Sequence, residues 1–296
     1  MRDSFSTYHP IVNFIYFTVI LLVSVFFLHP VLLLLSLFSG AAYFLCLKGK
    51  KKLISQLPFL LMVFLLPAII NPLFNHQGMT LLFYLRNGNP ITLESILYGL
   101  EAGVMMTVVL LWFGCFHEVM TSDKLMQLTG KWLPAVSLLF TMTLRFVPEF
   151  TTQMKKTAEA QKCVGIDVSS GNLITRIRHG LRVFSITLTW AFEHSIETAD
   201  SMKSRGYGLP GRSQFVRYRF DRRDRVLLIV VLGLTILFFT SLINGQLQIL
   251  YFPVFTMNTF DFWAMLAYIS YAILCFLPVI LHTMEEITWK YTRSKI

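Results

Sequence analysis

Long apolar runs separated by short polar segments make up most of this chain. A helix needs about 20 mostly apolar residues to cross a bilayer. Six runs reach or approach that length, so the pattern predicts an all-α, polytopic membrane protein with about six transmembrane helices. The predicted spans are residues 11–28, 31–47, 53–74, 93–116, 226–243 and 260–282.

The composition supports a membrane location. Hydrophobic residues make up 55% of the chain and charged residues only 14%, whereas a soluble domain carries about 25% charged residues. A soluble globule of this size could not hide so much apolar surface. The four cysteines lie far apart and form no CxxC pair, so the sequence predicts neither a zinc site nor a disulfide framework.

The positions of lysine and arginine predict which segments face the cytoplasm. If the N-terminus lies inside, 25 of the 26 basic residues fall in internal segments, and only Arg86 lies outside. We therefore expect a multi-pass protein of the cell membrane with both termini cytoplasmic. Its expected regions are an N-terminal membrane region of four spans (1–118), a cytoplasmic helical region (119–225), and a C-terminal membrane region of two spans with a tail (226–296).

The net charge of +10 is explained by this topology and by attraction to lipid headgroups in the bilayer. Nucleic acid is therefore not an expected partner. The external segment 71–92 carries turn signals on both sides of a short apolar patch at 81–85, which predicts a folded loop of hairpin type.

The cytoplasmic region is expected to contain two helices. Apolar positions spaced by three and four residues predict one helix over 146–162 and another over Leu173–Ser204. The second would be about 48 Å long. Glycines that end helices follow each of them, at Gly165 and Gly206. Two apolar runs, 132–144 and 183–192, are too short to span a membrane and suit buried or interfacial helices.

The end of the second helix is a candidate contact site. Lys203 and Arg205 lie where cations complement the helix dipole. The guanidinium of Arg205 offers five donors in a rigid fork, which suits an acidic pocket on another protein. An ordinary helix end, with a basic residue and a glycine cap, is the alternative interpretation.

These residues resemble a known family. Residues 199–211, ADSMKSRGYGLPG, are similar to the second signature of the transmembrane T component of energy-coupling factor (ECF) transporters, the EcfT and cobalt-importer CbiQ-like family. The signature is a small-residue–Arg–Gly triplet that ends a long coupling helix, here Ser204-Arg205-Gly206. The first family signature corresponds to residues 159–167. Further segments at 71–74, 89–92, 120–124 and 144–148 resemble the family in the same order.

Two departures from the family pattern stand out. The first triplet is Cys163-Val164-Gly165, with Val164 where the family usually has arginine, and Lys162 is the nearest replacement. The contact made by the first signature is thus either weakened or apolar. Near the N-terminus, His9-Pro10-Ile11 stands where the family has Asp-Pro-Arg.

The resemblance implies a non-catalytic membrane subunit with no cofactor or metal of its own. T components scaffold a membrane substrate-binding S component and dock on two cytoplasmic ABC ATPases, which bind the ATP. Such importers take up a vitamin or a transition-metal ion. On this basis Arg205 anchors one ATPase, Gly206 ends the helix, and Ser204 permits close approach. The weaker contact with the other ATPase falls to Lys162, Cys163, Val164 and Gly165.

Other classes of function stay open. An autonomous secondary transporter or channel would need ionisable residues within its spans, and the predicted spans are nearly free of them. Glu94 and Glu101 lie near the external end of the fourth predicted span. A non-transport membrane scaffold would also use long helices. A zinc enzyme is disfavoured because His117-Glu118 is not followed by a second histidine at the HExxH spacing. The pairs His194–Glu197 and His282–Glu285 lack a third ligand.

Overall fold

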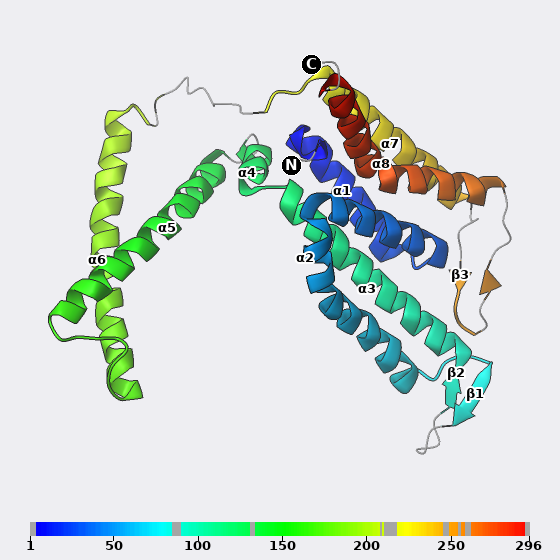
Figure 1. Ribbon diagram of the computed structural model, residues 1–296, viewed down its shortest axis with the longest axis horizontal. Helices are drawn as coiled ribbons and strands as arrows, with labels where there is room; N and C mark the ends of the chain where they lie inside the picture. The colour runs from blue at the N-terminus through cyan, green and yellow to red at the C-terminus, as the bar shows by residue number, and fades with distance from the viewer. Residues whose placement is uncertain are drawn as a thin grey trace. The chain divides into compact units, whose positions relative to one another are not determined.

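The computed structural model describes residues 4–84, 90–130, 134–207, 209, 218–244, 249–253, 256–257 and 262–293. The chain forms two compact units (Figure 1). The first, here the membrane unit, comprises Met1–Leu125 and Tyr218–Ile296, and the second, the helix-pair unit, comprises Met126–Arg217. Helix α4 (Ser122–Gly130) contains the boundary between them. The expected regions 1–118, 119–225 and 226–296 are defined by the side of the membrane on which each segment lies, and they stay predictions.

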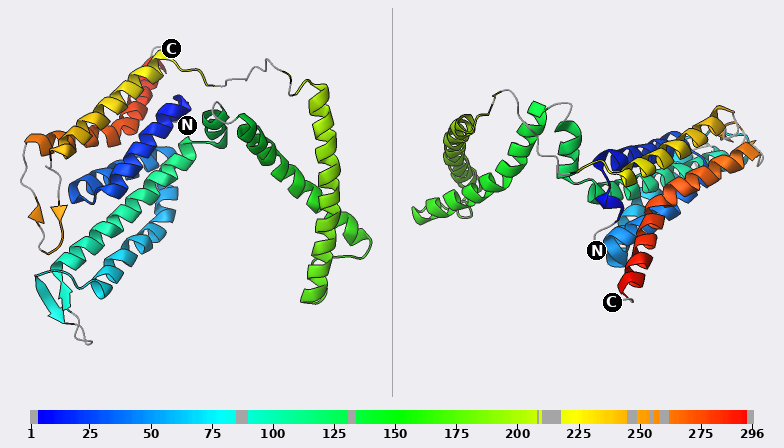
Figure 2. Two further views of the ribbon diagram at one scale, coloured as in Figure 1. Left: turned by 180° about the vertical axis from the view of Figure 1, so that it is seen from behind. Right: turned by 90° about the horizontal axis from the view of Figure 1, so that it is seen from above.

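The membrane unit consists of long apolar helices. Of the described helices, α2, α3, α7 and α8 are long and apolar enough to cross a membrane, and α1 is apolar but shorter. The expected all-α, polytopic membrane fold is thereby confirmed. Figure 2 shows α7 and α8 side by side from two further directions. The helices are α1 (Pro10–Phe26), α2 (Pro30–Phe74), α3 (Leu93–Val119), α7 (Arg222–Ile243) and α8 (Phe262–Arg293), preceded by the 3₁₀ helix η1 (Phe5–Thr7).

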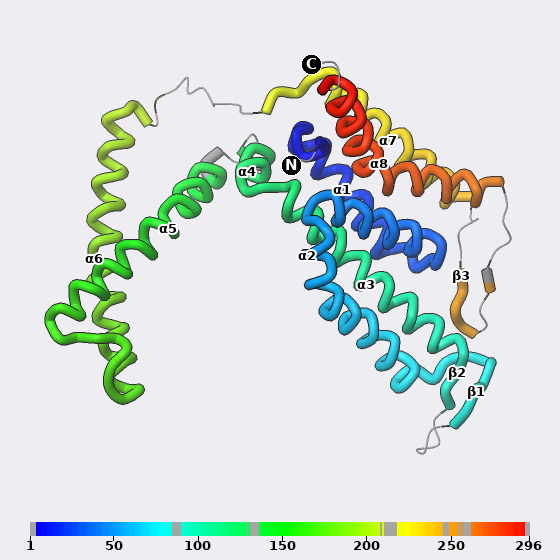
Figure 3. The backbone as a smooth tube through the Cα atoms, in the orientation of Figure 1, coloured from blue at the N-terminus to red at the C-terminus, as the bar shows by residue number. Residues whose placement is uncertain are grey.

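Helix α2 holds the second and third predicted spans in one element. Gly49 has φ 76° and ψ 166°, a non-helical conformation, so two helical halves meet there at a kink. The change of direction within α2 is visible in Figure 3. Glycine adopts such a φ without steric cost, which allows the chain to turn without a separate loop. Beside the kink, Lys48 lies 3.4 Å from the Glu118 carboxylate of α3 and over the Phe44 ring.

A buried polar network joins four helices of the membrane unit. The indole of Trp112 (α3) donates a 2.8 Å hydrogen bond to the hydroxyl of Ser36 (α2). The hydroxyl of Ser24 (α1) lies 3.3 Å from that of Ser36 and 3.2 Å from that of Tyr271 (α8). Polar groups in a bilayer find no water partners. This network therefore favours one arrangement of the four helices.

The N-terminal segment is fixed to the start of α7. One oxygen of Asp224 accepts a 3.0 Å hydrogen bond from the backbone amide of His9, and the other accepts one of 2.9 Å from the amide of Asp221. Asp224 thereby caps α7 and holds residues 4–9 against it. The ammonium of Lys124 donates to the carbonyl of Ser6 at 2.6 Å. These contacts place Tyr8 beside the first turn of α7.

Two short antiparallel strand pairs connect the helices. Strand β1 (Leu81–Tyr84) pairs with β2 (Pro90–Thr92), so the predicted hairpin in segment 71–92 is confirmed. Arg86, the basic residue expected outside, lies beyond the described residues. The second pair consists of β3 (Ile249–Leu250) and β4 (Thr256–Met257), which the hydropathy pattern does not predict.

The helix-pair unit contains α5 (Pro134–Cys163) and α6 (Leu173–Ser204). The predicted helix Leu173–Ser204 is confirmed with both ends correct. The predicted helix 146–162 has the correct end but the wrong start. The described part of the apolar run 132–144, residues 134–144, belongs to the same helix, which continues past Pro148, an interior proline. A proline removes one backbone hydrogen bond, and here the helix continues in spite of that loss.

Candidate functional site

The candidate site consists of two helix ends, defined here as the first helix end (residues 161–166) and the second helix end (202–207). At the first, Gly165 has φ 82°. The amide of Ile166 donates to the carbonyl of Gln161, and the amide of Gly165 donates to that of Lys162, both at 3.0 Å. This pair of bonds is the Schellman cap, which satisfies helix carbonyls that would otherwise lack partners.

The second helix end has the same backbone. Gly206 has φ 79°. The amide of Tyr207 donates to the carbonyl of Met202, and the amide of Gly206 donates to that of Lys203, again both at 3.0 Å. The two triplets singled out in the sequence are therefore structurally equivalent, with Val164 and Arg205 at matching positions just before the capping glycine.

The side chains presented by the two ends differ. Val164 is 74% exposed. Arg205 is also exposed, and among the described residues no carboxylate pairs with its guanidinium. The residues before them are small: Cys163 is exposed, and the Ser204 hydroxyl donates to the carbonyl of Ser201 at 2.8 Å. One end thus offers an apolar tip and the other a free cation.

Lys162, the expected replacement for the missing arginine, is engaged within its own turn. Its ammonium lies 3.3 Å from the carboxylate of Asp167. The other Asp167 oxygen accepts hydrogen bonds from the amide and the hydroxyl of Ser169, at 2.9 and 2.8 Å. The hydrogen bond from the Ser169 amide is the main reason why the pKa of Asp167 is lowered, and Lys162 adds to the effect. A partner would have to compete with Asp167 for Lys162.

An aromatic stack joins the two helices where they cross. The ring of Trp190 (α6) lies between those of Phe146 (α5) and His194, with centroids 6.3 and 5.1 Å apart and interplanar angles of 15° and 8°. Nε2 of His194 lies 3.4 Å from the carboxylate of Glu149 on α5. The crossing point therefore holds the two helices, and so their ends, at a defined angle.

Four of the apolar positions that predict α6 are exposed: Leu173, Ile177, Leu181 and Phe184. Further along the same helix, Leu188, Ala191 and Met202 are partly buried. The side chains of α6 that pack on α5 follow a neighbouring face and also step by four, three and four residues. This face consists of Val183, Thr187, Trp190 and His194. Its spacing was the available signal, but the polar side chains of Thr187 and His194 obscured it.

No group of three or more His, Cys, Asp or Glu side chains among the described residues could hold a metal ion. Residues 208, 210 and 211 of the second signature lie outside the described part of the chain. His9, at the departure from the N-terminal family pattern, caps α1 by accepting the amide hydrogen of Ile11 at 3.2 Å.

Comparison with known proteins supports the resemblance inferred from the motifs. No family model matches the chain. The energy-coupling factor transporter transmembrane protein EcfT of Ruminiclostridium cellulolyticum is 33% identical over 109 residues, which is 36% of this chain and 39% of that protein. EcfT of Streptococcus thermophilus is 30% identical over 105 residues, 35% of this chain and 40% of that protein. EcfT of Staphylococcus aureus is 29% identical over 111 residues, 37% of this chain and 41% of that protein.

The matched part thus spans about two fifths of the length of these curated relatives. These relatives are transmembrane proteins of energy-coupling factor transporters. The membrane unit of this chain has helices long and apolar enough to cross a membrane. The chain is similar, over about a third of its length, to the transmembrane T components of energy-coupling factor transporters.

Proposed function

We propose that this chain is the membrane coupling subunit of an ECF-type importer. In this role the two helix ends dock on a pair of cytoplasmic ABC ATPases, and the membrane unit holds a substrate-binding S component. ATP is bound and hydrolysed by the ATPases. The substrate, a vitamin or a transition-metal ion, is recognised by the S component and not by this chain.

The observation that carries the proposal is the pair of equivalent helix ends. Two long crossing helices terminate in the same cap, and each cap presents an exposed side chain directly before its glycine, Val164 or Arg205. A structural loop would gain nothing from an exposed valine at this position. Two partner subunits of related structure, each taking one helix end, would explain both the repetition and the exposure.

The unequal tips suggest that the two contacts differ in chemistry. Arg205 suits a carboxylate on its partner, because charge-assisted hydrogen bonds are the stronger kind. Val164 suits an apolar pocket, since Lys162 beside it is held by Asp167. The exposed apolar stripe of α6, from Leu173 to Phe184, gives a further surface for a membrane partner such as the S component.

The test is co-purification of the detergent-solubilised full chain with candidate ABC ATPases. Arg205→Glu places a carboxylate where a cation is needed and is expected to reduce capture at least tenfold. Arg182→Glu is the matched control, because Arg182 is exposed on the same helix away from its end. Equal capture of wild type and Arg205→Glu would contradict the role of Arg205.

Sidedness is tested separately with a membrane-impermeant thiol reagent. Cys163 is exposed at the first helix end, so in right-side-out vesicles it is expected to react only after the membrane is opened. A Cys163→Ser variant identifies its signal against the exposed Cys46. Labelling of Cys163 from outside would place the helix ends on the wrong side for ATPases.

One observation keeps the secondary-transporter alternative in view. Glu94 and Glu101 of α3 are only 1% and 7% exposed, and one oxygen of each has no hydrogen-bond partner among the described residues. Buried carboxylates in spans often mark ion pathways. Uptake that continues without ATPases and is abolished by Glu101→Gln would support that class. Uptake that depends on co-expressed ATPases would exclude it.

A further inference from the structure

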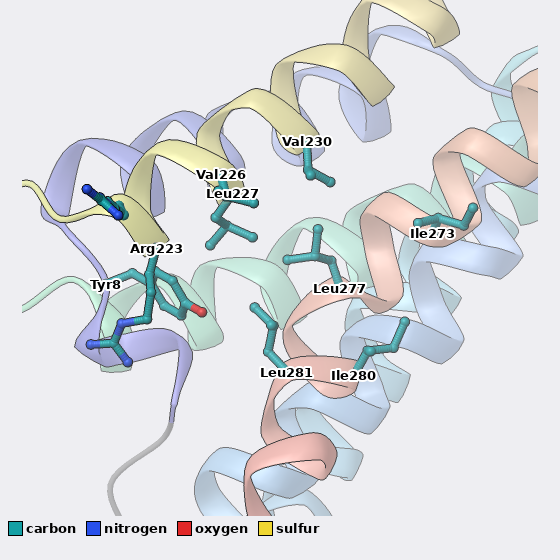
Figure 4. Close-up of a pocket in the computed structure, with 10 residues that line it drawn as sticks. Tyr8, Arg223, Val226, Leu227, Val230, Ile273, Leu277, Ile280 and Leu281 are labelled. Atoms are coloured by element: carbon teal, nitrogen blue, oxygen red, sulfur yellow. The ribbon is translucent and has the colours of Figure 1, made fainter.

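A groove runs between α7 and α8 of the membrane unit, with a volume of about 540 Å³ (Figure 4). That volume is within the range of ligand-binding pockets. Along most of its length the lining is aliphatic. At one end lie Tyr8, Arg222 and Arg223, so the groove combines an apolar slot with a polar, basic mouth.

The aliphatic part is shaped for a hydrocarbon chain. Leu227 of α7 and Leu277 of α8 form its floor, each only 7% exposed. Val230 and Ile273, one from each helix, remain exposed at 41% and 45%. Because α7 and α8 are both suited to span a membrane, these exposed side chains would face lipid tails.

The basic mouth lies where the span meets the headgroup layer. Arg222 and Arg223 are the first two residues of α7, and the apolar run begins at Val226. Within the described parts of the chain, no carboxylate forms an ion pair with either arginine. Asp221 and Asp224 flank the two arginines in sequence. The Asp224 carboxylate accepts hydrogen bonds from the backbone amides of His9 and Asp221.

Tyr8 adds a neutral donor to the mouth. Figure 4 shows its hydroxyl at the same end of the groove as Arg223. Burial raises the pKa of Tyr8, Arg223 opposes that shift, and Asp224 and Glu285 add to it. A neutral phenol hydroxyl is able to donate a hydrogen bond. Two cations and a hydroxyl donor together match a phosphate, which offers only negative charge and acceptor oxygens.

We propose that this groove binds a membrane phospholipid with an anionic headgroup. One acyl chain lies between α7 and α8, and the phosphate is held by Arg222, Arg223 and the Tyr8 hydroxyl. Basic pockets between membrane helices recognise anionic headgroups in this way. A zwitterionic lipid carries a compensating cation and gains less from two arginines. The proposal requires only the membrane unit and does not depend on the proposed coupling function.

The test uses native mass spectrometry of the full chain in detergent, titrated with dioleoyl phosphatidylglycerol or dioleoyl phosphatidylcholine. The wild type is expected to bind the anionic lipid about tenfold more tightly than the zwitterionic one. Arg222→Gln combined with Arg223→Gln removes that preference. Arg225→Gln combined with Arg219→Gln is the matched control, because both arginines belong to the same basic segment but do not line the groove.

A second variant pair tests the apolar part. Val230→Trp fills the groove, whereas Ile229→Trp places the same side chain on an exposed position of α7 outside it. We expect Val230→Trp to lower binding of both lipids and Ile229→Trp to leave it unchanged. Equal effects of the two arginine pairs would indicate general surface charge and overturn the proposal. A second outcome would also overturn it: Val230→Trp loses capture of the ATPases or the S component but still binds lipid. The groove would then hold a segment of a protein partner and not a lipid.

Discussion

The two helix ends of the helix-pair unit share a backbone and differ in chemistry. Gly165 and Gly206 adopt nearly the same left-handed φ, 82° and 79°, and support the same two capping hydrogen bonds. The residue before each glycine is valine in one case and arginine in the other. The glycine therefore determines where the helix stops, and the preceding position is free to vary with the surface that it meets.

The surroundings of the two ends differ as well. After the first end, the turn is held by Asp167, which binds both Lys162 and Ser169. After the second end, the amide of Leu209 donates to the carbonyl of Gly206 at 3.3 Å. The turn after the first end is thus held by the contacts of the Asp167 carboxylate, whereas the second end leaves Arg205 available to a partner. Three predictions test how far this difference extends.

The largest effect is expected for removal of the free cation. Arg205→Val makes the second helix end resemble the first, and leaves the carboxylate of a partner unpaired. Loss of one member of such a pair costs about 2–5 kcal/mol, so the affinity for the ATPase pair is expected to fall at least about 30-fold. Isothermal titration calorimetry with the solubilised full chain measures it.

Val164→Ala is the matched change at the first end. It removes only two methyl groups, each worth about 0.8 kcal/mol when fully buried, and is expected to weaken binding by about 15-fold at most. Val164→Arg asks whether the first partner accepts a cation. Similar losses for Arg205→Val and Val164→Ala would show that the two ends do not differ in the way proposed here.

The capping glycines are expected to give the next largest effect. An alanine in the left-handed region costs about 1–2 kcal/mol, so amide hydrogen exchange just after the cap should speed up by about 5- to 30-fold. Gly206→Ala is expected at the upper end of this range, because its Cβ would lie 3.2 Å from Leu209 Cδ1. Gly165→Ala is expected at the lower end, since a Cβ there meets nothing within 4 Å.

Gly180→Ala is the control for that pair. Gly180 lies in the interior of α6, and a Cβ there would meet only Val168 Cγ1 at 4.0 Å. Alanine favours a helix interior over glycine by about 1 kcal/mol, so exchange near residue 180 should slow down. Faster exchange in all three variants would mean that the left-handed conformation is not what the two end glycines supply.

The sequence predicted the parts of this structure that depend on local pattern. Apolar runs located the membrane helices, and the glycines marked both helix ends. The predictions failed where tertiary packing determines which face of a helix is buried. The periodicity of α6 fits two adjacent faces, and the more apolar stripe, which includes Leu181, is the exposed one. The face that packs on α5 includes Trp190 and His194, whose partners Phe146 and Glu149 are distant in sequence.

The pairing of Lys162 was also beyond the sequence. A lysine two positions before Val164 could have projected toward a partner. Only the path of the turn brings the Asp167 carboxylate to 3.3 Å from the Lys162 ammonium.

The sequence did not predict the groove between α7 and α8, for a similar reason. In the sequence, Arg222 and Arg223 indicate only which side of the membrane this segment faces. The contact of Asp224 with the N-terminal segment brings Tyr8 close to them.

The smallest effect is expected for the Asp167 carboxylate, which holds the turn after the first helix end. The pKa of Asp167 is lowered chiefly by the Ser169 hydrogen bonds and then by Lys162. A carboxylate with a lowered folded-state pKa contributes stability above its unfolded pKa, and that contribution is lost as the pH falls through its folded pKa. The turn after α5 is therefore expected to loosen only in acid, and the second helix end, which has no such carboxylate in the described residues, should show no matching change.

Carboxyl ¹³C resonances of aspartate-labelled full chain, with Asp167→Asn for assignment, measure this directly. The midpoint of Asp167 is expected below the value usual for an aspartate. Ser169→Ala should raise it by removing one hydrogen bond, and Lys162→Gln should raise it less, because the Lys162 pair is exposed to solvent. A larger rise with Lys162→Gln than with Ser169→Ala would show that charge, and not the hydrogen-bonded turn, holds the first end. Lys162 would then be the closer counterpart of Arg205.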